Sequence, residues 1–169
     1  WRGEQLALLA RQLHARQSSD HYAELIAEAR EEWQIRANGV DRPEVISGQA
    51  RNLDLLEQDL RRQQALDPDL VTALAKAKSQ GYDLWQQARS TSDFSLFAPA
   101  LRRMVELRQE QARQLAEPRG CWETLAQPFE PDLTLQRLQD LFAPLRKRLP
   151  ELLEQLKGSP RPSSLSWDL

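Results

Sequence analysis

The sequence predicts an all-α fold, a multi-helix antiparallel array of long helices joined by short loops that contain proline, glycine and serine. Two observations support this prediction. Apolar residues recur every three or four positions along most of the chain, which is the spacing of one helical face. No stretch alternates strictly between apolar and polar residues over five positions, as a half-buried strand does.

The first two helices are expected at residues 5–17 and 21–37. Their apolar stripes are formed by Leu6, Leu9 and Leu13 in the first helix, and by Leu25, Ile26, Ala29 and Trp33 in the second. Residues 18–20, Ser-Ser-Asp, provide N-cap side chains between the two helices. Asn38 and Gly39 end the second helix, because both residues tolerate the left-handed conformation.

A longer helix is expected at residues 44–66, opened by Pro43, since proline is tolerated in the first helical turn. Its apolar stripe consists of Ile46, Ala50, Leu53, Leu56 and Leu60. The following helix begins at Pro68, with Asp67 as its N-cap and Asp69 near the positive end of the helix dipole.

Gly81 lies inside that helix, where it marks either a close helix crossing or a tolerated defect. Residues 93–98 are predicted to form a short turn, with a new helix starting at Pro99, because proline inside a helix costs about 3 kcal/mol. This helix ends near Glu117, and a short helix follows at residues 122–126.

The final helix is capped by Asp132 or Thr134. Its apolar positions are Leu135, Leu138, Leu141, Phe142, Leu145, Leu149, Leu152 and Leu156. Pro144 and Pro150 interrupt this pattern, so a kink or a division into two pieces is expected.

Length and charge limit the classes of protein. The 169 residues are enough for one helical domain, expected at residues 1–157, and the proline- and serine-rich residues 158–169 are expected to be a flexible linker or tail. A net charge of −2 gives no electrostatic pull toward nucleic acid or an anionic membrane. No apolar run approaches the roughly 18 residues that span a bilayer.

The single cysteine, Cys121, allows no internal disulfide, which is typical of a reducing compartment, and we expect a cytoplasmic location. The chain begins at Trp1 rather than at methionine, and this start falls within a predicted helix. We therefore expect the true N-terminus to lie upstream.

The residues that most often carry chemistry are scarce. His14 and His21 are separated by about 10.5 Å along an ideal helix, too far to ligate one metal, and each is expected at the surface. Cys121 is expected to be a structural or unreactive thiol, because nothing in the sequence supplies it with a histidine base. The glycines form no phosphate-binding loop. We predict no catalytic, cofactor-binding or metal-binding residue in this chain.

The aromatic residues allow two interpretations. They could line a ligand groove, but helical spacing favours a role in filling and sealing the core between helices. The set comprises Trp33, Trp85, Phe94, Phe97, Trp122, Phe129 and Phe142.

Two segments carry a resemblance to a known family. Residues 92–112 read SDFSLFAPALRRMVELRQEQA and contain the element Asp-Phe-x-x-Phe-x-Pro. Residues 123–142 read ETLAQPFEPDLTLQRLQDLF and contain Phe-Glu-Pro-x-x-Thr. Together with the helical stretches at residues 3–16 and 50–89, they resemble the N-terminal half of the carboxypeptidase Taq family of metallocarboxypeptidases, over roughly residues 3 to 157.

The resemblance implies that this chain is part of a larger, all-helical, saddle-shaped peptidase that removes C-terminal residues from peptides. Zinc or another divalent metal would be held by a His-Glu-x-x-His helix and a later glutamate of the full-length enzyme. No His-Glu dipeptide occurs in this sequence, so no family ligand can be assigned to a position here.

This chain would then wall or cap the substrate cleft, remain inactive alone, and have the C-terminal catalytic half of the same polypeptide as its partner. Peptide substrates would bind through the full enzyme, and a homodimer is possible. The alternative is a stand-alone, non-catalytic helical interaction module.

Overall fold

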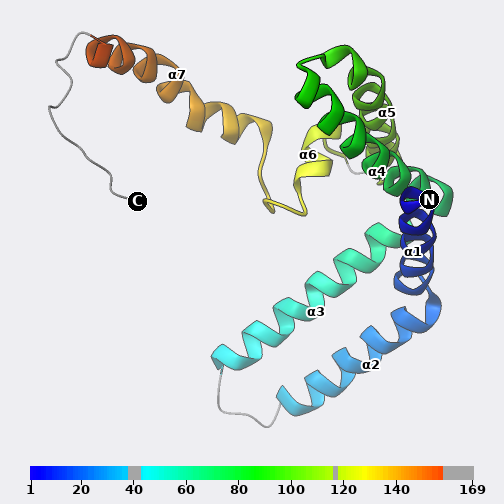
Figure 1. Ribbon diagram of the computed structural model, residues 1–169. Coiled ribbons are helices and arrows are strands. Elements are labelled where there is room, and N and C mark those ends of the chain that lie inside the picture. Colours follow the sequence, from blue (N-terminus) through cyan, green and yellow to red (C-terminus); the bar gives the residue numbers. More distant parts are fainter. Residues whose placement is uncertain (38–42, 116–117, 158–169) are drawn as a thin grey trace, which may run out of the picture. The chain divides into compact units, whose positions relative to one another are not determined.

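The computed structural model describes residues 1–37, 43–115 and 118–157, with side chains described outside 36–47, and these ranges are helical without any strand (Figure 1). The predicted all-α fold is confirmed. The elements are α1 (Arg2–Gln17), α2 (Asp20–Ala37), α3 (Pro43–Gln64), α4 (Pro68–Thr91), the 3₁₀ turn η1 (Phe94–Leu96), α5 (Ala98–Leu115), α6 (Cys121–Ala126) and α7 (Leu135–Lys157).

The chain divides into two compact units, Trp1–Thr124 and Leu125–Leu169. The expectation of one domain over residues 1–157 stays a prediction. The predicted helix end at Asn38 and Gly39, the end near Glu117 and the tail at 158–169 lie outside the described residues.

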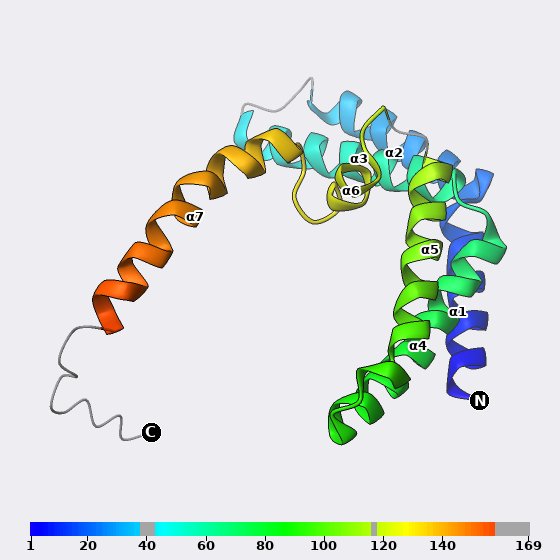
Figure 2. The ribbon, with the colours of Figure 1, turned by 90° about the horizontal axis from the view of Figure 1, so that it is seen from above.

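In the first unit, α4 lies between α1 and α5, and Figure 2 shows these three helices side by side. Both neighbours run antiparallel to α4, as predicted. Gly3 of α1 lies near Ser79, whereas Arg11 pairs with Asp69 at 3.4 Å, close to the start of α4. The backbone N–H of Asp67 donates to Gln114 Oε1 at 2.8 Å, which joins the start of α4 to the end of α5.

The face that α1 turns to α4 differs from the predicted one. Leu6, Leu9 and Leu13 are exposed, and the buried residues of α1 are Ala7 and His14. Close approach explains this correction. A Cβ on Gly3 would lie 3.7 Å from Ser79 Cβ, so small side chains face α4, while Leu9 and Leu13 turn outward and Leu6 lies at the edge of the contact.

The apolar core of the first unit lies where α4 begins. Leu66, Leu70 and Leu107 are buried together, and Val71, Ala73, Leu74, Ala77 and Leu115 pack against them. The Asp67 carboxylate caps α4 by accepting from the Asp69 backbone N–H at 2.6 Å, which confirms the predicted start. Burial at this end fixes the direction of α4 against α5.

The helices α2 and α3 pack against each other. Ile26, Leu53 and Leu60 are buried, as their stripe positions predict. Three other predicted stripe positions are exposed, at Leu25, Ala29 and Leu56. Arg30 of α2 donates to Asp54 Oδ1 at 2.8 Å and to Glu57 Oε1 at 2.5 Å on α3. These two carboxylates raise the pKa of Arg30. One guanidinium therefore links two successive turns of the opposite helix.

His14 is buried, with 4% of its surface exposed, so the surface position predicted for it is wrong. Its Nε2 lies 2.9 Å from the carbonyl oxygen of Gln63, in the last turn of α3. Carbonyls at a helix end lack helical partners, and the imidazole N–H donates to this one. His21 is exposed on α2, as predicted.

Two further expectations each left two alternatives, and the structure agrees with one of them in each case. A Cβ at Gly81 would meet no atom within 4 Å, so Gly81 marks no close crossing. Thr134 caps α7 by accepting from the Arg137 N–H at 3.1 Å. Asp132 is not the cap, because its φ of 65° is left-handed and its own N–H donates to Gln127.

In the second unit, α7 continues through Pro144 and Pro150 as one helix, so the predicted alternative of two pieces is wrong. Each proline removes a hydrogen bond to the carbonyl four residues earlier, at Asp140 and Arg146. Both of those residues are exposed, so water can reach the freed carbonyls.

The aromatic residues do not fill the core. Trp85, Phe94, Trp122, Phe129 and Phe142 are exposed, whereas Trp33 and Phe97 are half-buried. For Trp85 the layer of α1, α4 and α5 explains this correction, because a helix flanked on two sides by neighbours still presents its upper and lower faces to solvent.

Candidate functional site

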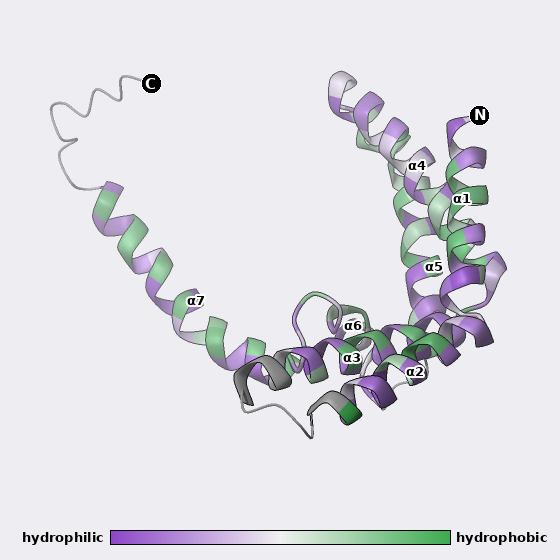
Figure 3. Ribbon diagram, turned by 90° about the horizontal axis from the view of Figure 1, so that it is seen from below, coloured by the Kyte–Doolittle hydropathy of each residue, from purple (hydrophilic) through white to green (hydrophobic). Residues whose placement is uncertain are grey.

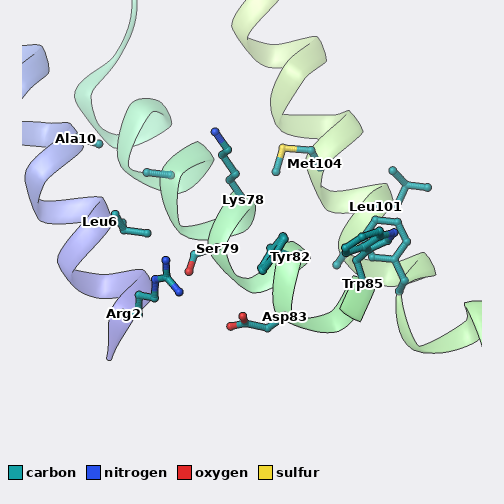
Figure 4. Close-up of a pocket in the computed structure, with 14 residues that line it drawn as sticks. Arg2, Leu6, Ala10, Lys78, Ser79, Tyr82, Asp83, Trp85, Leu101 and Met104 are labelled. Atoms are coloured by element: carbon teal, nitrogen blue, oxygen red, sulfur yellow. The ribbon is translucent and has the colours of Figure 1, made fainter. Parts of the chain in front are cut away.

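A groove crosses one face of the α1, α4 and α5 layer, with a cavity volume of about 700 Å³. Figure 4 shows its lining, with Leu6 from α1, Tyr82 and Trp85 from α4, and Leu101 and Met104 from α5. Lys78, Tyr82 and Trp85 share a face of α4, because they are spaced by four and three positions. Trp85 and Phe97 both line this groove, which is the position that the second, less favoured interpretation of the aromatics requires.

The groove is apolar with a few charged groups. Its charged lining residues are Arg2, Lys78 and Asp83. No histidine or cysteine belongs to this described lining, so it offers no imidazole and no thiol. Such a surface suits the binding of an apolar side chain or helix face.

The aromatic residues of the groove contact one another and their neighbours. The Tyr82 and Trp85 rings are 5.9 Å apart between centroids, and the Arg89 guanidinium lies 5.5 Å from the centroid of the Trp85 ring. Phe94 and Phe97 meet edge to face at 6.1 Å, across the junction of η1 and α5.

The ionisable groups with shifted pKa values lie outside this groove. Lys76 lowers the pKa of Glu4 through a hydrogen bond and charge attraction between α4 and α1. Arg113 and Gln114 lower the pKa of Glu110 within α5. Each shift comes from an exposed pair that joins or stiffens helices, so these groups act on the fold rather than on a reaction.

The structure does not bring the candidate chemical residues together. His14 lies on α1 against Gln63, His21 lies on α2 with Glu24 3.9 Å away, and Cys121 is exposed at the start of α6. Among the described residues, no group of three or more histidine, cysteine, aspartate or glutamate side chains is arranged to hold a metal ion. These positions therefore do not fit a zinc centre.

Among the described residues, no helix combines the length and the apolar character that a membrane span requires.

Comparison with known proteins places this chain in a family. The model of the carboxypeptidase Taq (M32) metallopeptidases matches residues 1–166. The chain belongs to this family. The resemblance carried by the Asp-Phe-x-x-Phe-x-Pro and Phe-Glu-Pro-x-x-Thr elements is thereby confirmed.

Two relatives in the carboxypeptidase Taq family show the extent of the match. Thermostable carboxypeptidase 1 of Thermus thermophilus is 31% identical over 170 residues, which cover 94% of this chain and 31% of that protein. Carboxypeptidase 1 of Bacillus subtilis is 31% identical over 81 residues, covering 48% of this chain and 16% of that protein. The chain thus spans about a third of the length of the first of these relatives.

A solved structure supports the same fold. The crystal structure of BsuCP superposes with a TM-score of 0.80 at 23% identity, over 94% of this chain and 30% of that one. At this identity, the likeness concerns the fold alone. The helical arrangement described above is therefore found within a larger protein, of which it covers 30%.

Proposed function

We propose that this chain is the N-terminal helical portion of a metal-dependent carboxypeptidase that removes C-terminal residues from peptides. It shapes or caps the substrate cleft and carries no catalytic residue. The supporting observation is the unequal coverage, because the match includes 94% of this chain but only 31% of the Thermus thermophilus carboxypeptidase.

The metal site of the parent enzyme belongs to the remaining two thirds of the polypeptide. The histidines of this chain are otherwise engaged or isolated, since His14 is buried against the Gln63 carbonyl and His21 is exposed on another helix. Zinc or another divalent metal would supply a Lewis acid and an activated water in that other portion. The present residues contribute by positioning and by excluding solvent.

The proposed cleft-shaping role is supported by the exposed apolar surface. The groove across α1, α4 and α5 presents Tyr82 and Trp85 at 53% and 40% exposure. An apolar groove with a few polar groups is the usual form of a contact site for a ligand or for another part of a fold. The proposed partners are peptide substrates, the C-terminal catalytic half and a second copy in a homodimer. The proposed location of the protein is the cytoplasm.

The test compares the complete parent polypeptide with the 169-residue chain. Each is incubated with zinc or cobalt and a blocked dipeptide, and release of the C-terminal residue is measured. We expect metal-dependent release by the parent and none by the chain, because the donors reside elsewhere.

Two outcomes contradict the proposal. Metal-dependent hydrolysis by the chain alone would show that the site lies within these residues. A parent without a His-Glu-x-x-His segment and without peptidase activity would favour the stand-alone interaction module.

A further inference from the structure

The helix α7 presents an apolar seam that follows a strict heptad spacing. Its members are separated alternately by three and four positions, from the first turn of the helix to the last. They are Leu135, Leu138, Phe142, Leu145, Leu149, Leu152 and Leu156. This spacing brings every member onto one narrow face, as in the a and d positions of a coiled coil.

The seam is open in the described chain. Along α7 the apolar side chains are exposed by 42% to 59%, except for Leu138, which is half-buried. Figure 3 shows hydrophobic and hydrophilic residues alternating along this helix. An uncovered seam of this length costs free energy in water, so it calls for a partner helix.

The prolines of α7 lie away from the seam. In the heptad that starts at Leu135, Pro144 occupies a c position and Pro150 a b position, both on the outer side. Proline on the solvent side bends a helix so that its other face becomes concave. The apolar side is thus the side that curves around a neighbour.

Charge selects the kind of neighbour. Arg146 and Arg148 occupy the e and g positions that flank the seam, and neither makes an ion pair with any part of the described chain. The acidic residues of α7 occupy c and f positions on the outer side. They are Asp140, Glu151 and Glu154.

Intrahelical bonds hold two of these acids on the outer side. Asp140 accepts from Gln136 at 2.9 Å, and Glu154 pairs with Lys157 at 2.7 Å. A second copy of α7 would therefore bring no carboxylate to the flanking arginines. A partner of different sequence, with acidic residues beside its apolar stripe, would do so.

We propose that the seam of α7 docks one amphipathic helix with acidic flanks, located in the part of the parent polypeptide outside this chain. This proposal rests on the proposed function, because the partner helix belongs to the remaining two thirds of the length of the relatives. The seam pairs with that helix in a left-handed crossing. Ion pairs of Arg146 and Arg148 with its acidic residues set the register between the two helices.

The test is thiol labelling in the complete parent polypeptide, read by mass spectrometry at each introduced cysteine. Leu145→Cys and Leu152→Cys probe the seam, and Lys147→Cys is the matched control at an outer position. We expect the two seam thiols to react at least about tenfold more slowly than the control in the native protein, because a packed partner must open first. In denaturant all three should react alike.

Charge reversal tests the acidic flank. Arg148→Glu should accelerate labelling at Leu145→Cys, whereas Arg137→Glu, the same change at an outer position, should not. Equal acceleration by both variants, or by neither, would contradict the acidic partner.

Three results overturn the proposed docking. Seam thiols that react as fast as the control show an open face, including the case in which the complete protein is no longer than this chain. Protection that disappears on dilution identifies a second copy. Protection that persists in the 169-residue chain alone identifies its first unit, Trp1–Thr124, as the cover. Peptidase activity of the same samples reports separately on the proposed function.

Discussion

His14 shows how one polar side chain joins two helices. Its imidazole lies 96% buried between α1 and the last turn of α3, where Nε2 reaches the Gln63 carbonyl at 2.9 Å. That carbonyl also accepts from the Leu66 N–H at 3.2 Å, within the turn that leads to α4. The side chain therefore fills a junction on which the placement of three helices depends.

Replacement of His14 should destabilise the fold. We expect His14→Ala to lower the free energy of unfolding by about 2 kcal/mol, because it leaves a cavity and removes a buried hydrogen bond. Urea denaturation followed by circular dichroism measures this change. The matched control is His21→Ala, which should change stability by no more than about 0.5 kcal/mol, as at other exposed positions. Equal losses in both variants would show that His14 has no special role.

The sequence could not predict this burial. His14 and His21 have similar local surroundings, each within a helix rich in charged residues. The difference between the two histidines comes from the fold, which brings Gln63 of α3 against His14 of α1. These two residues are 49 positions apart in the sequence. The same limit applies to the groove, since Lys78, Tyr82 and Trp85 share a helical face that becomes a wall only when α1 and α5 flank it.

At the scale of the elements, the central helix α4 depends on its first turn. Asp67 caps it at 2.6 Å, the Asp67 N–H bonds to Gln114, and Leu66 and Leu70 are buried beside the cap. Local capping and tertiary packing thus coincide at one end of the helix. This concentration of contacts anchors the layer that carries the groove.

Removal of this cap should have a measurable effect. We expect Asp67→Ala to destabilise the chain by about 1 kcal/mol, the usual cost of losing an N-cap side chain. Gln80→Ala, at an exposed position inside the same helix, is the control and should leave the unfolding midpoint nearly unchanged. Hydrogen exchange then checks whether protection decreases mainly in the first turns of α4. A uniform decrease, or none, would contradict a local cap.

Helix starts were predictable because caps are local. Asp67, Ser19 and Thr134 each accept from a backbone N–H two or three positions ahead, so the signal lies within one turn. The buried faces were less predictable. Leu9 and Leu13 of α1 are exposed because Gly3 and Ala7 occupy the close approach to α4. Apolar spacing alone does not reveal which face meets a neighbour.

At the scale of the whole molecule, exposed apolar surface is the main feature. The groove in the first unit and the seam of α7 in the second both lack cover within the described residues. A chain that matches about a third of the Thermus thermophilus carboxypeptidase would leave such surfaces where the rest of the fold packs. The family was identifiable from two short elements that contain phenylalanine and proline, Asp-Phe-x-x-Phe-x-Pro and Phe-Glu-Pro-x-x-Thr. The amphipathic helices between them have a pattern that many helical proteins share.

Zinc binding tests the central claim most directly, namely that the metal ligands of the parent enzyme lie outside these 169 residues. The purified chain is dialysed against zinc and then against metal-free buffer, and bound metal is measured by mass spectrometry, with the parent enzyme as the positive control. We predict that the parent retains zinc and that the chain retains none, since His14 is engaged with Gln63 and His21 is isolated on α2. One tightly held zinc per chain, lost on substitution of His14 or His21, would contradict the account.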